Sequence, residues 1–105
     1  MSCKSTSIVA GGTGRVCISS APGTIGIDFY LEGSHIWYNW KMSLQRYTNG
    51  RWSTIDTRNG YVSPDSPSHR SFTNIAAKNA QMRVKIDLMN PSEVFTSIYS
   101  PQIKF

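Results

Sequence analysis

Hydrophobic and polar residues alternate with a period of two through most of the chain. The clearest runs cover residues 24–31, 36–45 and 82–88. In the first run Ile25, Ile27 and Phe29 alternate with Gly26, Asp28 and Tyr30. Alternation of this kind is typical of β-strands with one face in a core and the other in water. The pattern therefore predicts an all-β protein.

Turn-forming residues divide these runs into seven or eight short strands. The predicted strands cover residues 6–10, 14–19, 24–32, 35–47, 51–57, 70–75, 81–89 and 94–99. Asn49-Gly50 indicates a tight hairpin, Asn59-Gly60 indicates a second turn, and only residues 73–80 leave room for a helical turn. Many short antiparallel strands with regular turns favour a β-sandwich of jelly-roll or immunoglobulin-like type.

A two-residue turn at Asn49-Gly50 fixes which residues face each other across the predicted hairpin. Tyr47 then faces Trp52, and Leu44 faces Ile55. Tyr47 and Trp52 fall on the face opposite Leu44. The hairpin is therefore expected to show aromatic rings on its outer side.

Trp37 lies an even number of residues from Tyr47 and therefore falls on the same face of the predicted strand. Trp37, Tyr47 and Trp52 thus form a candidate aromatic patch. Exposed aromatic rings on a strand face serve protein interfaces, and they also stack on glycans or bases. The alternative is a bulge near residues 45–46, which would return Tyr47 to the core. These three interpretations stay open at this point.

The composition indicates one domain with a moderately basic surface. The 105 residues include 11 Lys or Arg and 6 Asp or Glu, giving a net charge of +5. The basic residues are dispersed, so they predict solubility and attraction to anionic surfaces rather than nucleic-acid binding. No stretch approaches the about 20 apolar residues of a membrane span, and no secretory signal is visible. We therefore expect synthesis in the cytoplasm, followed by retention there or release by lysis or a non-standard route.

Catalytic and metal-binding patterns are missing from the sequence. His35 and His69 lie beside turns, without cysteines or carboxylates at ligand spacing. Gly11-Gly12-Thr13-Gly14 precedes a strand rather than a helix, which argues against a phosphate-binding loop. We expect no enzyme activity, no metal and no cofactor.

Both cysteines lie in the first 17 residues, and they differ in their surroundings. Cys3 belongs to a polar leader, whereas Cys17 belongs to an apolar strand. Gly11, Gly12 and Gly14 form a candidate hinge between them. We therefore divide the chain into a connector with its hinge (1–14) and a sandwich domain (15–105). In a reducing cytosol two free thiols are the alternative to a cross-link.

The leader with Cys3, the spacer Gly11–Gly14 and the strand Val16-Cys17-Ile18 resemble the pilin subunits of bacterial endospore appendages. The resemblance implies a jelly-roll whose N-terminal connector docks on neighbouring subunits. It also implies disulfides between subunits and a final location on the cell or spore surface or outside the cell. This chain has one connector cysteine where members of that family carry a pair, and it has no cysteine near its C-terminus.

These observations favour a non-enzymatic structural subunit that assembles with itself into a fibre or ring through its N-terminal arm. Cys3 and Cys17 would cross-link the subunits. One alternative is a small module that binds a glycan or an anionic surface through Trp37, Tyr47 and Trp52. A second alternative is a basic secreted toxin or antimicrobial β-protein.

Overall fold

The computed structural model describes residues 1–8, 12–33, 37–89 and 94–105. These residues form nine β-strands and no helix, so the predicted all-β class is confirmed. The strands are β1 (Ser2–Ser7), β2 (Thr13–Ala21), β3 (Thr24–Glu32), β4 (Tyr38–Thr48), β5 (Arg51–Val62), β6 (Ser68–Phe72), β7 (Gln81–Met89), β8 (Val94–Tyr99) and β9 (Ile103–Lys104).

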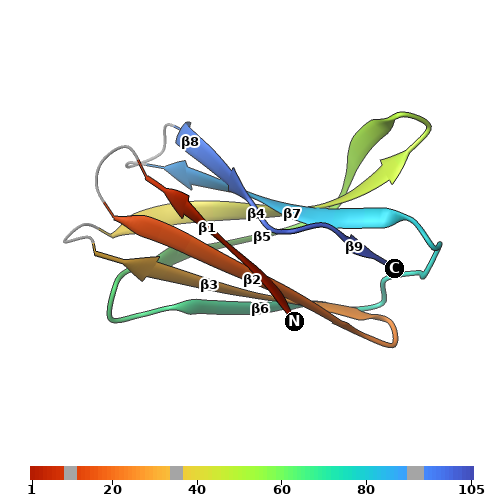
Figure 1. Ribbon diagram of the computed structural model, residues 1–105, viewed down its shortest axis with the longest axis horizontal. Coiled ribbons are helices and arrows are strands. Elements are labelled where there is room, and N and C mark those ends of the chain that lie inside the picture. The colour runs from red at the N-terminus through yellow and green to blue at the C-terminus, as the bar shows by residue number, and fades with distance from the viewer. Residues whose placement is uncertain (9–11, 34–36, 90–93) are drawn as a thin grey trace.

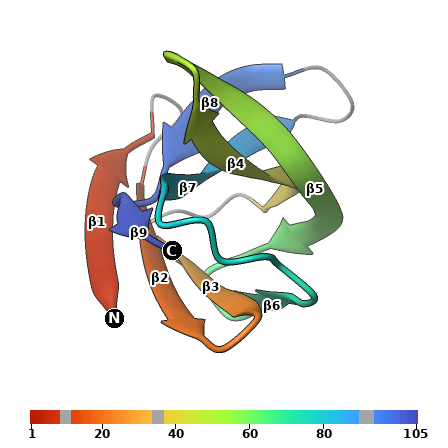
Figure 2. The same ribbon diagram turned by 90° about the vertical axis from the view of Figure 1, so that its right-hand side faces the viewer.

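The strands form two antiparallel sheets that pack face to face as a sandwich, as the sequence predicted (Figures 1 and 2). The first sheet has the order β1-β2-β3-β6. The second has the order β5-β4-β7-β8, and β9 pairs with the end of β7. β1 and β6 are therefore the two edges of the first sheet.

The core lies between the inward faces of the two sheets. Alternate residues of β3 and β7 are buried, as the period of two predicts. The largest fully buried side chains include Trp40, Tyr38, Phe29 and Phe72. β1 contributes no residue to this core cluster, which receives only Ile8 from the first eight residues of the chain.

Trp40 connects the two sheets, and Gly60 makes room for its ring. The indole Nε1 donates to Ser68 Oγ at 2.9 Å, and that hydroxyl donates to the Tyr61 carbonyl at 2.8 Å. Gly60 faces Trp40 across the β4–β5 ladder, and a Cβ there would lie 2.5 Å from Trp40 Cζ2. The turn predicted at Asn59-Gly60 is wrong: both residues lie inside β5, because glycine is needed here for close packing.

The β4–β5 hairpin turns at Asn49-Gly50, as predicted, with φ of 55° and 80° at these residues. Tyr47 faces Trp52, which confirms one predicted pair. The predicted Leu44–Ile55 pair is wrong, because the register shifts between Leu44 and Gln45 and Leu44 faces Asp56. Ile55 is the extra residue of this bulge, and Tyr47 stays outside with 45% of its surface exposed.

Several elements differ from the prediction, including β5, expected at 51–57 and observed at Arg51–Val62, and β6, expected at 70–75 and observed at Ser68–Phe72. The strand expected at residues 6–10 ends at Ser7 and begins at Ser2. Residues 73–80 form no helical turn; they contain two left-handed residues, Asn74 and Asn79, with φ of 58° and 51°. β9 was not predicted, because a two-residue strand carries no periodic signal.

Candidate functional site

The N-terminal strand β1 lies on the outside of the sandwich and depends on β2 alone. All six positions from Ser2 to Ser7 pair with β2, from Ile18 back to Thr13. Five of the six side chains are exposed, and only Thr6 is half-buried. The segment expected as a free connector is thus an edge strand of its own sandwich, held by backbone hydrogen bonds rather than by core packing.

Cys3 and Cys17 face each other across this ladder and form a disulfide within the chain. The cross-link predicted for these two residues is present. The predicted partner differs: the bond was expected between subunits, and the structure closes it within one chain. The register explains this outcome, because β1 folds back and brings Cys3 opposite the chain's own Cys17.

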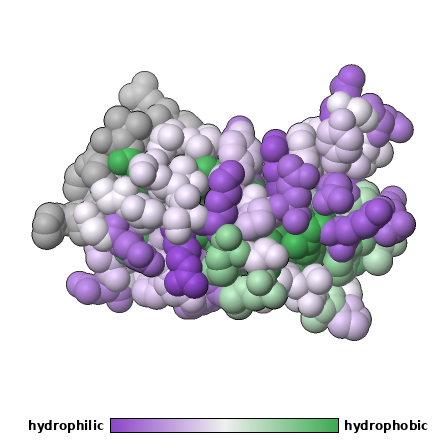
Figure 3. Space-filling view, viewed as in Figure 1, coloured by the Kyte–Doolittle hydropathy of each residue, from purple (hydrophilic) through white to green (hydrophobic). Residues whose placement is uncertain are grey.

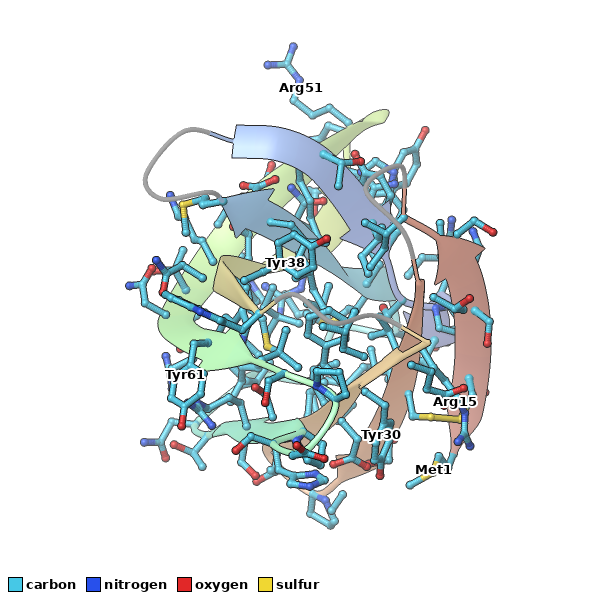
Figure 4. The ribbon with its side chains drawn as sticks, turned by 90° about the vertical axis from the view of Figure 1, so that its left-hand side faces the viewer. Met1, Arg15, Tyr30, Tyr38, Arg51 and Tyr61 are labelled. Carbon is cyan, nitrogen blue, oxygen red and sulfur yellow. A yellow bond between two sulfur atoms is a disulfide. The ribbon has the colours of Figure 1, made fainter. Side chains whose placement is uncertain are left out.

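Charged and aromatic side chains surround the disulfide on the outer face of the first sheet. Arg15 Nη2 lies 3.9 Å from Cys3 Sγ, and the Arg15 guanidinium lies 5.4 Å from the centre of the Tyr30 ring. Figure 4 shows the disulfide beside Arg15, with Tyr30 and Met1 at the same end of the view. A cation therefore sits against the exposed sulfur of the bond.

The same row of the sheet continues across β3 to β6. Cys17 faces Asp28 across the β2–β3 ladder, and Asp28 faces His69 across the β3–β6 ladder. His69 Nδ1 and Asp28 Oδ1 are 2.6 Å apart, and the Tyr30 ring meets the His69 ring edge-on at 5.8 Å. Sequence reasoning missed this pair, because the two residues are 41 positions apart and meet only through the sheet order.

The three glycines predicted to form a hinge do not share one structural setting. Gly12 has a φ of 94°, a backbone conformation that favours glycine, and its carbonyl accepts from the Ile8 amide at 3.0 Å. Gly14 is not part of a hinge: it lies inside β2, and a Cβ there would lie 2.8 Å from Ile98 Cδ1. Gly11 lies outside the described residues. The predicted division at residue 14 also differs from the structure, since β1 belongs to the first sheet.

The predicted aromatic patch is two separate clusters. Trp37 and Tyr47 are ten residues apart along one strand direction, a span of about 30 Å. Trp37 meets Tyr61 at a ring-centre distance of 6.5 Å, whereas Tyr47 meets Trp52 at 5.2 Å. The shared parity that joined the three residues in the sequence does not bring them together.

The Tyr47–Trp52 cluster continues onto β7 and β8 through Arg83. The Arg83 guanidinium lies 4.1 Å from the centre of the Trp52 ring and 4.4 Å from that of Tyr99. Its Nε donates to Gln45 Oε1 at 2.9 Å. Arg83 therefore occupies ring surface of Trp52 that a ligand would need for stacking.

The Trp37–Tyr61 cluster is more open. Trp37 is 59% exposed and Tyr61 is 57% exposed. Together with Ser63 they line a shallow depression of about 400 Å³. Figure 4 shows Tyr61 on the outside of the molecule, far from Arg15 and the disulfide.

The surface around the two termini carries apolar area. Figure 3 shows apolar surface right of centre, in the part of the molecule where Figure 1 places both termini. Ile103 and Phe105 are partly buried there and pack on the core. Met1 is 81% exposed.

The disulfide gives the described residues a group that can undergo thiol–disulfide exchange. Among residues 1–8, 12–33, 37–89 and 94–105, no three His, Cys, Asp or Glu side chains come together as metal ligands. These same residues contain no helix that is long and apolar enough to cross a membrane. His35 lies outside the described residues. The disulfide on an exposed edge strand is therefore the candidate site, and the Trp37–Tyr61 depression is a second one.

Comparisons with protein families, with curated proteins and with solved structures return no match to this chain.

Proposed function

We propose that this protein is a non-enzymatic structural subunit that assembles with copies of itself by exchanging β1. In the exchanged form β1 of one copy pairs with β2 of the next copy. The observation that carries the proposal is that β1 adds no residue to the core cluster. A sandwich that does not need β1 for its core can release it without unfolding.

The contacts of β1 are equally available between copies. The β1–β2 pairing consists of a six-position ladder and one disulfide, and both depend only on β2 as a partner. A β1 from a neighbouring copy in the same register would form the same ladder, with its Cys3 opposite the acceptor's Cys17. Exchange of an identical element between protomers is a low-cost route to oligomers.

The direction of exchange determines what is built. Where each copy donates its strand to one neighbour and accepts a strand from another, the contact is heterologous, whereas reciprocal exchange between two copies closes a dimer. Heterologous contacts close into a ring or continue as a filament. The closed and exchanged forms have the same β1–β2 contacts. Which form predominates therefore depends on the protein concentration relative to the effective concentration of the strand tethered to its own chain. That effective concentration is in the millimolar range for short flexible linkers.

The test is to reduce the protein fully, reoxidise it at about 1 mM, near that effective concentration, and examine the products by size-exclusion chromatography and electron microscopy. We expect rings or filaments joined by disulfides on a non-reducing gel. A variant without residues 2–7 has no strand to donate and no Cys3, so it should form no rings or filaments by strand exchange under the same conditions. Monomeric wild-type protein after reoxidation at this concentration would contradict the proposal.

The Trp37–Tyr61 depression supports a second candidate function, the binding of a glycan. Two exposed rings stand at 86° to each other, and Ser63 is a third residue of the same depression. An aromatic face that contacts the C–H groups of a sugar ring, next to a hydroxyl, combines apolar contact with a hydrogen-bonding group. This site differs from the predicted one, since it uses Trp37 but neither Tyr47 nor Trp52.

A glycan array of neutral and anionic oligosaccharides tests this second function. Trp37→Ala should remove any retention, because it deletes one wall of the depression. Trp52→Ala is the matched control, since its ring is already covered by Arg83. Equal binding by both variants would contradict a glycan site at Trp37 and Tyr61.

A further inference from the structure

The two sulfur atoms of the disulfide lie in different surroundings. Cys3 is on the exposed edge strand, next to the Arg15 guanidinium. Cys17 is only 1% exposed, and it faces Asp28 on the neighbouring strand. Cys3 is thus an exposed residue with its sulfur near a positive charge, whereas Cys17 is covered and its neighbour across the ladder is Asp28, whose carboxylate is paired with His69.

This difference sets which exchange reactions are favourable. A disulfide is broken when a thiolate attacks one sulfur and the other leaves as a thiolate. A small thiol reaches the exposed Cys3 sulfur, but Cys17 then has to leave as an anion in a buried place facing Asp28. Attack on Cys17 instead releases the Cys3 thiolate beside Arg15 and in water. Cys3 is therefore the better leaving group, but it is released only by attack on Cys17, which is the less accessible sulfur.

A second copy of β1 is the thiol carrier that fits this arrangement. When β1 peels from β2, the β2 edge opens and Cys17 becomes accessible. A strand pairing with β2 in the register of β1 brings its own Cys3 opposite Cys17. A small thiol has no such pairing to hold it there.

We propose that the Cys3–Cys17 bond is transferred between copies by strand-coupled thiol–disulfide exchange. The Cys3 thiolate of one copy attacks Cys17 Sγ of a closed copy. A Cys3–Cys17 bond forms between the copies, the bond within the closed copy breaks, and its Cys3 leaves as a thiolate. This inference rests on the proposed function and specifies the chemistry of its joining step.

The reaction conserves disulfides and therefore propagates. Each step breaks one disulfide, forms one and regenerates one Cys3 thiolate, so no oxidant is consumed. The released thiolate attacks Cys17 of the next closed copy. A single fully reduced copy, produced by a low-molecular-weight thiol, is the initiator of each chain. The number of chains is then the number of reduced copies.

Arg15 acts on the thiolates of this reaction. Its guanidinium is 3.9 Å from Cys3 Sγ and packs against the Tyr30 ring. A cation at this distance stabilises the departing Cys3 thiolate, and it attracts the incoming one to the same place. Because Arg15 is exposed, the attraction is weakened by water, and its loss should slow exchange about fivefold.

The experiment mixes unlabelled and ¹⁵N-labelled closed protein at about 1 mM, near the effective concentration of the strand, with a small fraction of fully reduced protein. An alkylating agent stops the reaction at intervals. Mass spectrometry then measures Cys3–Cys17 peptides with one labelled and one unlabelled half. We expect these hybrid peptides only when the reduced copy is added unalkylated. Their absence with an active reduced copy would overturn the proposal.

Variants of Arg15 test the role of its charge. Arg15→Gln should slow the appearance of hybrid peptides about fivefold, and Arg15→Lys should retain most of the rate. Arg51→Gln removes the same charge at the β4–β5 turn, which Figure 4 shows at the opposite end of the view, and should change nothing. Equal rates for Arg15→Gln and Arg51→Gln would overturn the assignment of Arg15.

The two proposals fail in distinguishable ways. Hybrid peptides that accompany only dimers, with no ring or filament in the microscope, would support exchange and contradict the structural function. Filaments formed by a Cys3→Ser variant would support β1 exchange and overturn the covalent route. Wild-type filaments whose cross-links include hybrid peptides in the share expected for random joining of labelled and unlabelled copies would support both.

Discussion

Removing residues 2–7 should leave the sandwich folded, and this is the sharpest test of the view that β1 is not part of the core. The variant joins Met1 to Ile8, so that the buried Ile8 side chain is kept. It should unfold in one cooperative transition. The core cluster that remains is the whole of the wild-type cluster, because β1 contributes nothing to it.

The stability that is lost comes mainly from the disulfide. The bond joins residues 14 positions apart, and closing a loop of this size contributes about 3 kcal/mol by the chain-entropy estimate. The ladder adds little: each hydrogen bond contributes about 0.5–1.5 kcal/mol, which is offset by about 1–2 kcal/mol for ordering each residue. For a domain of this size, about 3 kcal/mol corresponds to a fall in Tm of roughly 12–24 °C.

The matched control is Cys3→Ser, which loses the disulfide but keeps the β1 ladder. Both variants leave Cys17 as a free thiol in reducing buffer, so they should agree within about 1 kcal/mol in the free energy of unfolding. Urea denaturation followed by tryptophan fluorescence at low protein concentration measures this difference. If the deletion variant is unfolded while Cys3→Ser is folded, β1 belongs to the core and the reasoning is refuted.

Two further predictions concern the contact between the sheets. Gly60→Ala should lower the free energy of unfolding by about 1–3 kcal/mol, because the added Cβ would press on the Trp40 ring. The control is Gly26→Ala, whose Cβ would meet only the Ser19 hydroxyl at 3.1 Å and should lower the free energy of unfolding by less. Thermal unfolding compares the two variants. Ser68→Ala should lower the free energy of unfolding by about 1–3 kcal/mol in the same assay, because the buried Trp40 indole loses its acceptor. Its control, Ser71→Ala at an exposed position, should leave the free energy of unfolding nearly unchanged. Equal stabilities within either pair would contradict these roles.

The sequence predicted the strands that have one buried face. β3 and β7 alternate strictly, and their burial follows that alternation residue by residue. β1 could not be found in this way. Its side chains are nearly all exposed, so no face is apolar and no period appears in the sequence.

Contacts between distant residues account for the errors in the predicted site. Asn59-Gly60 is a turn signal locally, and only the Trp40 ring on the neighbouring strand shows why Gly60 lies inside β5. Trp37 and Tyr47 share a face by parity, but parity carries no information about distance along the strand. The ring partner of Trp37, Tyr61, is set by the β4–β5 register beyond a bulge.

β1 also has a protective role in the closed chain, and this role explains why its attachment is covalent. The next strand inward, β2, pairs with β3 on one side, so its other side would be an open edge without β1. Open edges are templates for pairing with other chains. Hydrogen bonds alone would hold a six-residue strand without core contacts only weakly on this edge. The disulfide keeps β1 tethered to β2, so that β1 returns to this edge each time the ladder opens and the edge that faces other chains is the polar strand β1. The same bond therefore keeps the closed copy from unspecific pairing and, once exchanged, joins it to a specific partner.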